Sequence, residues 1–134
     1  MFLHQSPHVV IARLPGTTII RFKRLKESPR TALEVRTQLQ KTVDALNTVD
    51  RRAYSLLMDM RDAPMLHVVP EFEQILDEYR PRIMSGFAKV AVLVKTSVGK
   101  LQVTRMARED GVDIRIFNDE AEALAYLTGR PEAR

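Results

Sequence analysis

The chain has 134 residues, which suits one globular domain, and its 45% hydrophobic and 28% charged residues argue against intrinsic disorder. The absence of cysteine excludes disulfides, thiol nucleophiles, cysteine zinc sites and iron–sulfur clusters. The net charge of +4 specifies no partner by itself. We expect a single domain over residues 1–134, with its core at about 8–128.

The charge is unevenly distributed along the chain. Residues 1–52 carry ten Lys or Arg against four Asp or Glu, whereas residues 53–134 carry eleven against thirteen. The first residues lack the basic and apolar segments of a secretory signal. The longest aliphatic run, residues 90–94, is far shorter than the roughly 20 residues that span a bilayer. The expectation is a cytoplasmic protein with no membrane span and a basic N-terminal part.

The first expected elements are two strands that pair as a hairpin. Residues 8–14 are rich in β-branched side chains, and a Pro-Gly pair that suits a type II turn separates them from residues 17–23. In the second strand, Ile20 and Phe22 alternate with basic residues, which predicts one buried and one solvated face. This hairpin is expected to form an antiparallel edge of the sheet.

The rest of the chain alternates between helical and apolar segments. A helix is expected near residues 29–48, with Ser28 as its N-cap. The elements expected after it are a strand at 54–60, a helix from Pro70 that Pro81 kinks or ends, a strand at 87–94, a helix at 97–110, a strand at 113–117 and a helix capped by Asn118 or Asp119. Strands that alternate with helices imply parallel pairing. The sequence predicts an α/β fold with a mixed, mostly parallel sheet, in the order β-β-α-β-α-β-α-β-α.

Four segments occur in an order that is typical of a known family. They read LLMDMRDAP (56–64), PEFEQIL (70–76), FAKVAVLVKTSVGKLQ (87–102) and FNDEAEALAYL (117–127). Together they resemble small bacterial SpoIIAA-like proteins, which are stand-alone STAS or Sec14-like domains. The resemblance implies a SpoIIAA/STAS-like fold and a non-catalytic role in regulation or protein interaction.

The chain departs from this family at the phosphorylation site. Anti-sigma factor antagonists of the SpoIIAA type carry an Asp-Ser-Ser or Asp-Ser-Thr site downstream of the strand that 57–60 matches. The corresponding residues 65–71 contain neither Ser nor Thr. The family's phosphoserine therefore has no counterpart here.

Candidate chemical groups gather where the strand at 54–60 is expected to end. Asp59, Arg61 and Asp62 lie there, and ligands of open α/β sheets prefer the crevice beyond the carboxyl ends of the strands. Two carboxylates would serve as acid and base if their pKa values were pushed apart. Alternatively, Asp59 bonds backbone N–H groups, and Asp62 pairs with an arginine or caps a turn. No nucleophile or metal ligand accompanies them, so no catalytic residue is predicted.

A second candidate lies at the start of the helix at 97–110. Thr96, Ser97 and Lys100 would add hydroxyls and a charge to the N–H groups that favour an anion there. The segment lacks the GxxxxGK[ST] pattern of a nucleotide-binding loop, and in the alternative interpretation Thr96 or Ser97 only caps the helix. With Arg61 and Asp62, these residues form the hypothetical site for a small apolar or anionic ligand.

The densest basic cluster consists of Arg21, Lys23, Arg24 and Lys26. A nucleic-acid surface would need stacking aromatics or a recognition helix, and Phe22 is the one aromatic nearby. Nucleic acid is therefore not expected as a partner. The favoured interpretation is that these charges lie on an edge hairpin and deter aggregation. An acidic protein or an anionic membrane surface remains an alternative as a partner.

The helix at 97–110 has no clean apolar stripe. Its apolar residues spread over more than half of its circumference, which indicates a dimer contact, a partner site, a pocket wall or a helix sandwiched between neighbours. The three histidines, His4, His8 and His67, show no metal-binding spacing, and no metal or other cofactor is expected. The leading hypothesis is a protein-interaction or regulatory domain with a protein partner or a homodimer. The alternative is a carrier or sensor of a small lipid or anion.

Overall fold

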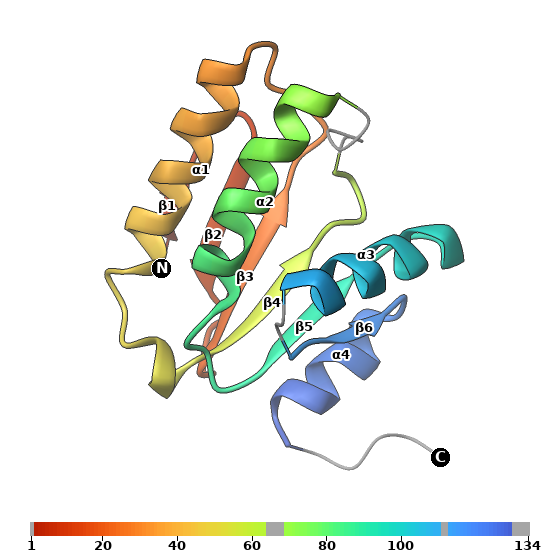
Figure 1. Ribbon diagram of the computed structural model, residues 1–134. Coiled ribbons are helices and arrows are strands. Elements are labelled where there is room, and N and C mark those ends of the chain that lie inside the picture. Colours follow the sequence, from red (N-terminus) through yellow and green to blue (C-terminus); the bar gives the residue numbers. More distant parts are fainter. Residues whose placement is uncertain (1, 64–68, 111–112, 130–134) are drawn as a thin grey trace.

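A computed structural model describes residues 2–63, 69–110 and 113–129 of the chain. Within these ranges it shows a six-stranded sheet with four α-helices (Figure 1). The strands are β1 (Phe2–Gln5), β2 (Val9–Arg13), β3 (Ile19–Arg24), β4 (Ser55–Asp59), β5 (Val90–Leu93) and β6 (Arg115–Phe117). The helices are α1 (Ala32–Leu46), α2 (Pro70–Met84), α3 (Ser97–Asp110) and α4 (Glu120–Leu127), with a 3₁₀ turn η1 (Arg51–Ala53) before β4.

The sheet is mixed, as the sequence predicts. Its strands follow one another in space in the order β1-β2-β3-β4-β5-β6. The β1–β2 and β2–β3 pairs are antiparallel, and every pair from β3 to β6 is parallel. The α/β class, the antiparallel N-terminal part and the parallel remainder are thereby confirmed.

Strand β1 was not predicted, and it changes the position of the hairpin. Its four residues are exposed or half-buried and show no clear alternation, so its pairing with β2 defines it more than its composition does. Because β1 occupies the edge, β3 lies inside the sheet between β2 and β4. The expectation that residues 17–23 form a sheet edge is therefore wrong.

Helix boundaries follow from local chemistry. Helix α1 begins after Thr31, whose Oγ1 accepts the Glu34 N–H at 3.1 Å, so the start expected at Pro29 was too early. Helix α2 begins at Pro70 and ends at Met84, with Pro81 inside its last turn. Before α4, the Asp119 side chain accepts the Ala121 N–H at 3.1 Å, as the capping prediction requires.

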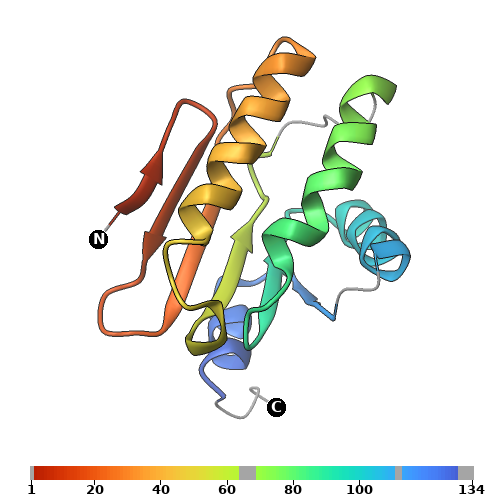
Figure 2. The ribbon, with the colours of Figure 1, turned by 60° about the vertical axis from the view of Figure 1, so that its left-hand side comes forward.

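The helices are divided unequally between the two faces of the sheet. Parallel crossovers share one hand, and those from β3 to β6 advance in one direction, so α1, α2 and α3 fall on the same face. Helix α4 packs on the opposite face, against β4 and β5 (Figure 2). None of the helices in the described ranges is long and apolar enough to cross a bilayer.

Alternation along β4 links the two hydrophobic cores. Leu56 and Met58 belong to the larger core, under α1 and α2, whereas Leu57 belongs to the smaller core, under α4. Asp59 follows Leu57 by two residues and therefore lies on the α4 face. A polar cluster on one face and a cavity on the other result from this alternation.

Candidate functional site

Asp59 is buried at the carboxyl end of β4 and has two arginine partners. The residue is 1% exposed. Its Oδ2 accepts Arg21 Nη2 at 2.6 Å and Arg61 Nη2 at 2.8 Å. Its Oδ1 accepts Arg61 Nε at 2.9 Å and the Arg61 backbone N–H at 3.2 Å. The carboxylate is thus saturated by charged and backbone donors.

Glu120, in the first turn of α4, completes this cluster. Its Oε1 lies 3.1 Å from Arg21 Nη2 and 3.2 Å from Arg61 Nη2. We call Arg21, Asp59, Arg61 and Glu120 the Asp59 cluster. It ties β3, the end of β4 and the start of α4 together, with two positive and two negative charges.

The surroundings of Asp59 keep it ionised. Burial alone would raise the pKa of its carboxyl, but the hydrogen bonds from Arg61 and Arg21 oppose this and hold the pKa well below its usual range. Because of its bond to Asp59, the pKa of Arg61 is raised. A carboxylate this acidic is a poor proton donor or acceptor at neutral pH, which removes the main support for acid–base catalysis at Asp59.

At the predicted ligand site around Arg61, two of the polar side chains already have partners within the protein. Arg61 is engaged by Asp59 and Glu120, and Asp62 is half-buried beside it. Thr96 caps α3, because its Oγ1 accepts the Gly99 N–H at 3.0 Å, and Lys100 is exposed. The side chain of Ser97 lies outside the described residues, as does the segment at 64–68 that holds His67 and most of the stretch without Ser or Thr.

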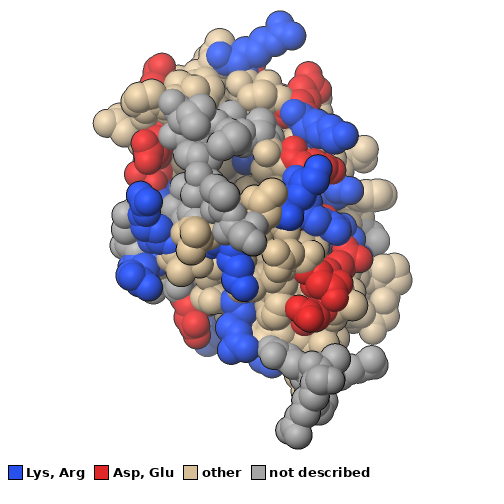
Figure 3. All heavy atoms as spheres, turned by 90° about the vertical axis from the view of Figure 1, so that its right-hand side faces the viewer, with Lys and Arg blue, Asp and Glu red and all other residues tan. Residues whose placement is uncertain are grey.

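The four basic residues of the predicted patch do not share one surface. Arg21 and Lys23 lie on the α4 face of β3, whereas Arg24 lies on the opposite face and is only 7% exposed. Lys26 is exposed beyond the strand. On the face shown in Figure 3, basic side chains are interspersed with acidic ones, with no continuous basic field. The edge-protection interpretation also fails, because β3 is an internal strand.

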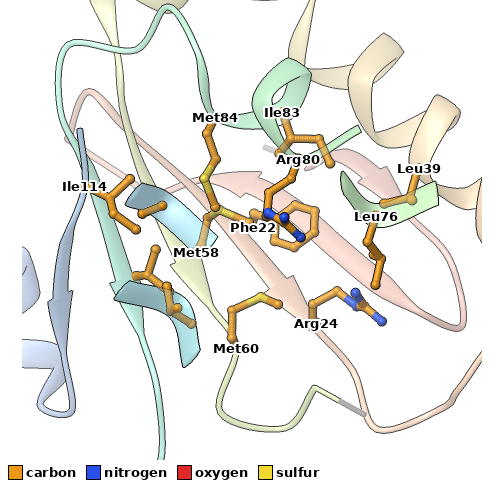
Figure 4. A pocket seen from close by; sticks show the side chains of 13 residues that line it. Phe22, Arg24, Leu39, Met58, Met60, Leu76, Arg80, Ile83, Met84 and Ile114 are labelled. Carbon is orange, nitrogen blue, oxygen red and sulfur yellow. The ribbon is translucent and has the colours of Figure 1, made fainter. Parts of the chain in front are cut away.

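A cavity of about 100 Å³ lies between the sheet and the helices α1, α2 and α3. We call the face of the sheet that these helices cover the three-helix face. The floor of the cavity is formed by Phe22, Met58 and Val92 from three neighbouring strands, and most of its roof comes from α2 and α3 (Figure 4). The carboxyl halves of β3 and β4 bound it, since Arg24 and Met60 line one end. The wall is almost entirely apolar.

Three methionines and two residues of α3 line this cavity. Met58, Met60 and Met84 all line it, and these flexible thioether side chains adapt to irregular shapes. Helix α3 contributes Val103 and Ala107. The helix expected at 97–110 therefore forms part of a pocket wall, which is one of the roles that its apolar residues indicate.

Two arginines reach the cavity, and they differ in their partners. Arg80 on α2 donates to Asp77 Oδ1 at 2.5 Å. For Arg24, no hydrogen bond or ion pair of the guanidinium occurs with any described residue, and its Nε is buried without a partner. Burial lowers the pKa of Arg24 to about 10, so it stays charged at neutral pH.

Sequence reasoning missed Arg24 as a cavity residue, although a signal for it existed. Ile20, Phe22 and Arg24 are spaced by two along one strand, so the rule that buries Ile20 and Phe22 also buries Arg24. Arg24 was instead grouped with its basic neighbours. An arginine in the apolar register of a strand is the more informative pattern.

No family model matches this chain, and searches of curated proteins and of solved structures found no match either. In the described part of the chain, no group of three or more His, Asp or Glu side chains is placed to hold a metal ion.

Proposed function

We propose that this chain is a non-catalytic domain of the SpoIIAA-like type that carries or senses a small, mainly apolar ligand in the cavity under α2 and α3. The observation that supports the proposal best is the cavity itself, of about 100 Å³ with an apolar wall. Protein interiors are close-packed, and an unfilled cavity lowers stability. An apolar cavity of this scale stays dry and accepts a benzene-sized molecule.

The position of the cavity also supports ligand binding. It lies toward the carboxyl ends of the parallel strands β3 and β4, the end at which open α/β sheets usually bind ligands. Its lining combines rigid strand residues with adaptable methionines. The site therefore differs from the predicted crevice, where Arg61 and Thr96 already have partners within the protein.

The SpoIIAA-like part of the proposal is supported by the quoted segments and by the alternation of strands and helices from β3 onward. A protein-interaction role, with a partner or a second copy, is the second candidate. The observation in its favour is Leu101, which is 71% exposed on α3, the helix that also walls the cavity. Binding of a ligand in the cavity would affect binding of a partner most directly through this helix.

A cavity-filling variant tests the proposed function. Ala107→Leu adds volume at the cavity wall and keeps a strong helix former in α3. With hexanoate, hexanol and benzene as probes, we expect ligand to raise the melting temperature of the wild type. The stabilisation is about 2.7 kcal/mol at a hundredfold excess over Kd, and Ala107→Leu should lose it.

Leu101→Ala is the matched control, because it changes an exposed residue on the same helix. It should keep the ligand-induced rise in melting temperature. A sedimentation coefficient lower than that of the wild type would reveal a dimer that depends on Leu101. If no probe stabilises the wild type, or if Ala107→Leu responds as fully as the wild type does, the cavity is not a ligand site. A partner that is lost only in Leu101→Ala would favour the interaction role.

A further inference from the structure

Arg24 is a charged group buried among mainly apolar side chains, and Gln38, Thr42 and Arg80 are the polar residues that line the same cavity or the adjoining hollow. It is 7% exposed, and it lines both the main cavity and an adjoining hollow of about 10 Å³. Figure 4 shows it extending from β3 toward the side of the cavity that Leu76 and Leu39 line. Buried charges in proteins are normally paired, because desolvation is otherwise uncompensated.

The surrounding protein offers this guanidinium little compensation. Among the described residues, no carboxylate or carbonyl accepts a hydrogen bond from it, and its Nε is buried without a partner. A hollow of about 10 Å³ is close to the smallest that holds one water molecule. One water would satisfy only part of the five guanidinium N–H donors, of which the Nε–H is buried without a partner.

We propose that Arg24 anchors the acidic head of an amphiphilic ligand whose apolar body fills the adjoining cavity. This inference rests on the proposed function and names the ligand class for the same site. A carboxylate or a phosphate monoester would accept two parallel hydrogen bonds from the guanidinium. The apolar body would contact Phe22, Met58 and the α3 residues Val103 and Ala107.

Arg24 suits this role better than the other cationic groups nearby. Arg80 also lines the cavity, but it is bonded to Asp77 of its own helix. Arg21 and Arg61 lie on the other face of the sheet and are held by Asp59 and Glu120. Of these four arginines, Arg24 is therefore the one whose bonding capacity is left for a ligand.

The size of the cavity limits the apolar body. A volume of about 100 Å³ is of the order of the engineered cavities that take up benzene. A six-carbon chain or a single aromatic ring matches this scale. Rearrangement of Met58, Met60 and Met84 would admit somewhat longer chains.

The test compares hexanoate with hexanamide, its uncharged isostere, and with hexyl phosphate. Dissociation constants are measured at pH 7 by titration calorimetry on the full chain. For the wild type we expect hexanoate or hexyl phosphate to bind at least about tenfold more tightly than hexanamide, the usual gain from hydrogen bonds to a charged group. The tighter of the two acids shows whether the head is a carboxylate or a phosphate.

Arg24→Met removes the charge and keeps an apolar side chain of similar length, and it should reduce the preference for the acid to about onefold. Arg24→Lys keeps the charge without the planar fork and should retain part of the preference. Lys23→Met is the matched control, because it removes a positive charge one residue away on the opposite face. It should keep the full preference.

The outcomes separate the two proposals. If hexanamide binds as tightly as both acids, the anchor is wrong and the apolar cavity stands. If none of the three probes binds, the proposed function fails as well. A preference for acids that persists unchanged in a folded Arg24→Met variant would also overturn the role of Arg24.

Discussion

Arg21 and Arg24 are three residues apart on β3, and they lie in opposite electrostatic surroundings. Arg21 contacts Asp59 and Glu120 on the α4 face, whereas Arg24 has no carboxylate partner among the described residues of the three-helix face. Both arginines are substantially buried. A buried charge with partners ties elements of the fold together, whereas one without partners is available for a ligand.

Removal of the buried carboxylate from the Asp59 cluster should have the largest effect on stability. Asp59→Ala removes the buried partner that Arg21 and Arg61 share and leaves them only the exposed Glu120, and loss of one member of a buried ion pair usually costs about 3 kcal/mol or more of folding free energy. Urea denaturation should show this loss. Asp62→Ala is the control, because Asp62 is half-buried next to the same loop, and we expect a loss below about 1 kcal/mol. Equal losses in the two variants would contradict the importance of the Asp59 cluster.

Substitution of Arg24 should change the free energy of unfolding in the opposite direction. Arg24→Met removes a desolvated charge and places an apolar side chain among apolar neighbours, so the ligand-free protein should gain about 2 kcal/mol of stability. Lys23→Met, on the other face, should stay within about 0.5 kcal/mol of the wild type. If Arg24→Met is instead clearly less stable than the wild type in chemical denaturation, Arg24 has a stabilising partner of its own.

The stabilisation that Asp59 contributes should also depend on pH. Since folding lowers the pKa of Asp59, its contribution to stability is fully present above the unfolded carboxyl pKa of about 3.9 and declines as pH falls toward the folded value. The difference in unfolding free energy between the wild type and Asp59→Asn should shrink by about 1 kcal/mol from pH 6 to pH 3. A difference that stays constant over this range would show that Asp59 is not held at a low pKa.

The exposed member of the Asp59 cluster should have the smallest effect. The side chain of Glu120 is 38% exposed, so its ion pairs with Arg21 and Arg61 contribute only about 0.5 kcal/mol. Glu120→Gln should lower stability by that amount. Glu122→Gln, in the same turn of α4 but exposed and outside the cluster, controls for the interaction with the helix dipole. Equal effects of the two substitutions would show that Glu120 acts only through the dipole.

The fold was largely predictable because its cues are local. Pro70 begins α2, Asp119 caps α4, and the apolar runs near β4 and β5 mark strands that are buried on both faces. Strand β1 escaped prediction because its definition comes from its pairing with β2. That omission also placed β3 wrongly at an edge of the sheet.

The candidate site was less predictable because it depends on distant contacts. Asp59 was identified as a notable carboxyl, but its partner Arg21, and Glu120, which contacts the same two arginines, are far from it in the sequence. The bonds of Arg61 to Asp59 and Glu120 were not predicted either. The cavity combines side chains of three strands and of all three helices on one face, and no local pattern reports that space.

Local periodicity, capping residues and prolines were enough to predict an α/β chain with antiparallel strands first and parallel strands after them, because these signals act over a few residues. The alternation in β3 also places Arg21 and Arg24 on opposite faces, although the sequence analysis grouped them in one basic cluster. Only the tertiary structure decided which of them meets a carboxylate. Pairing requires two groups within about 4 Å, and whether segments distant in sequence come that close depends on packing of the whole sheet and its helices.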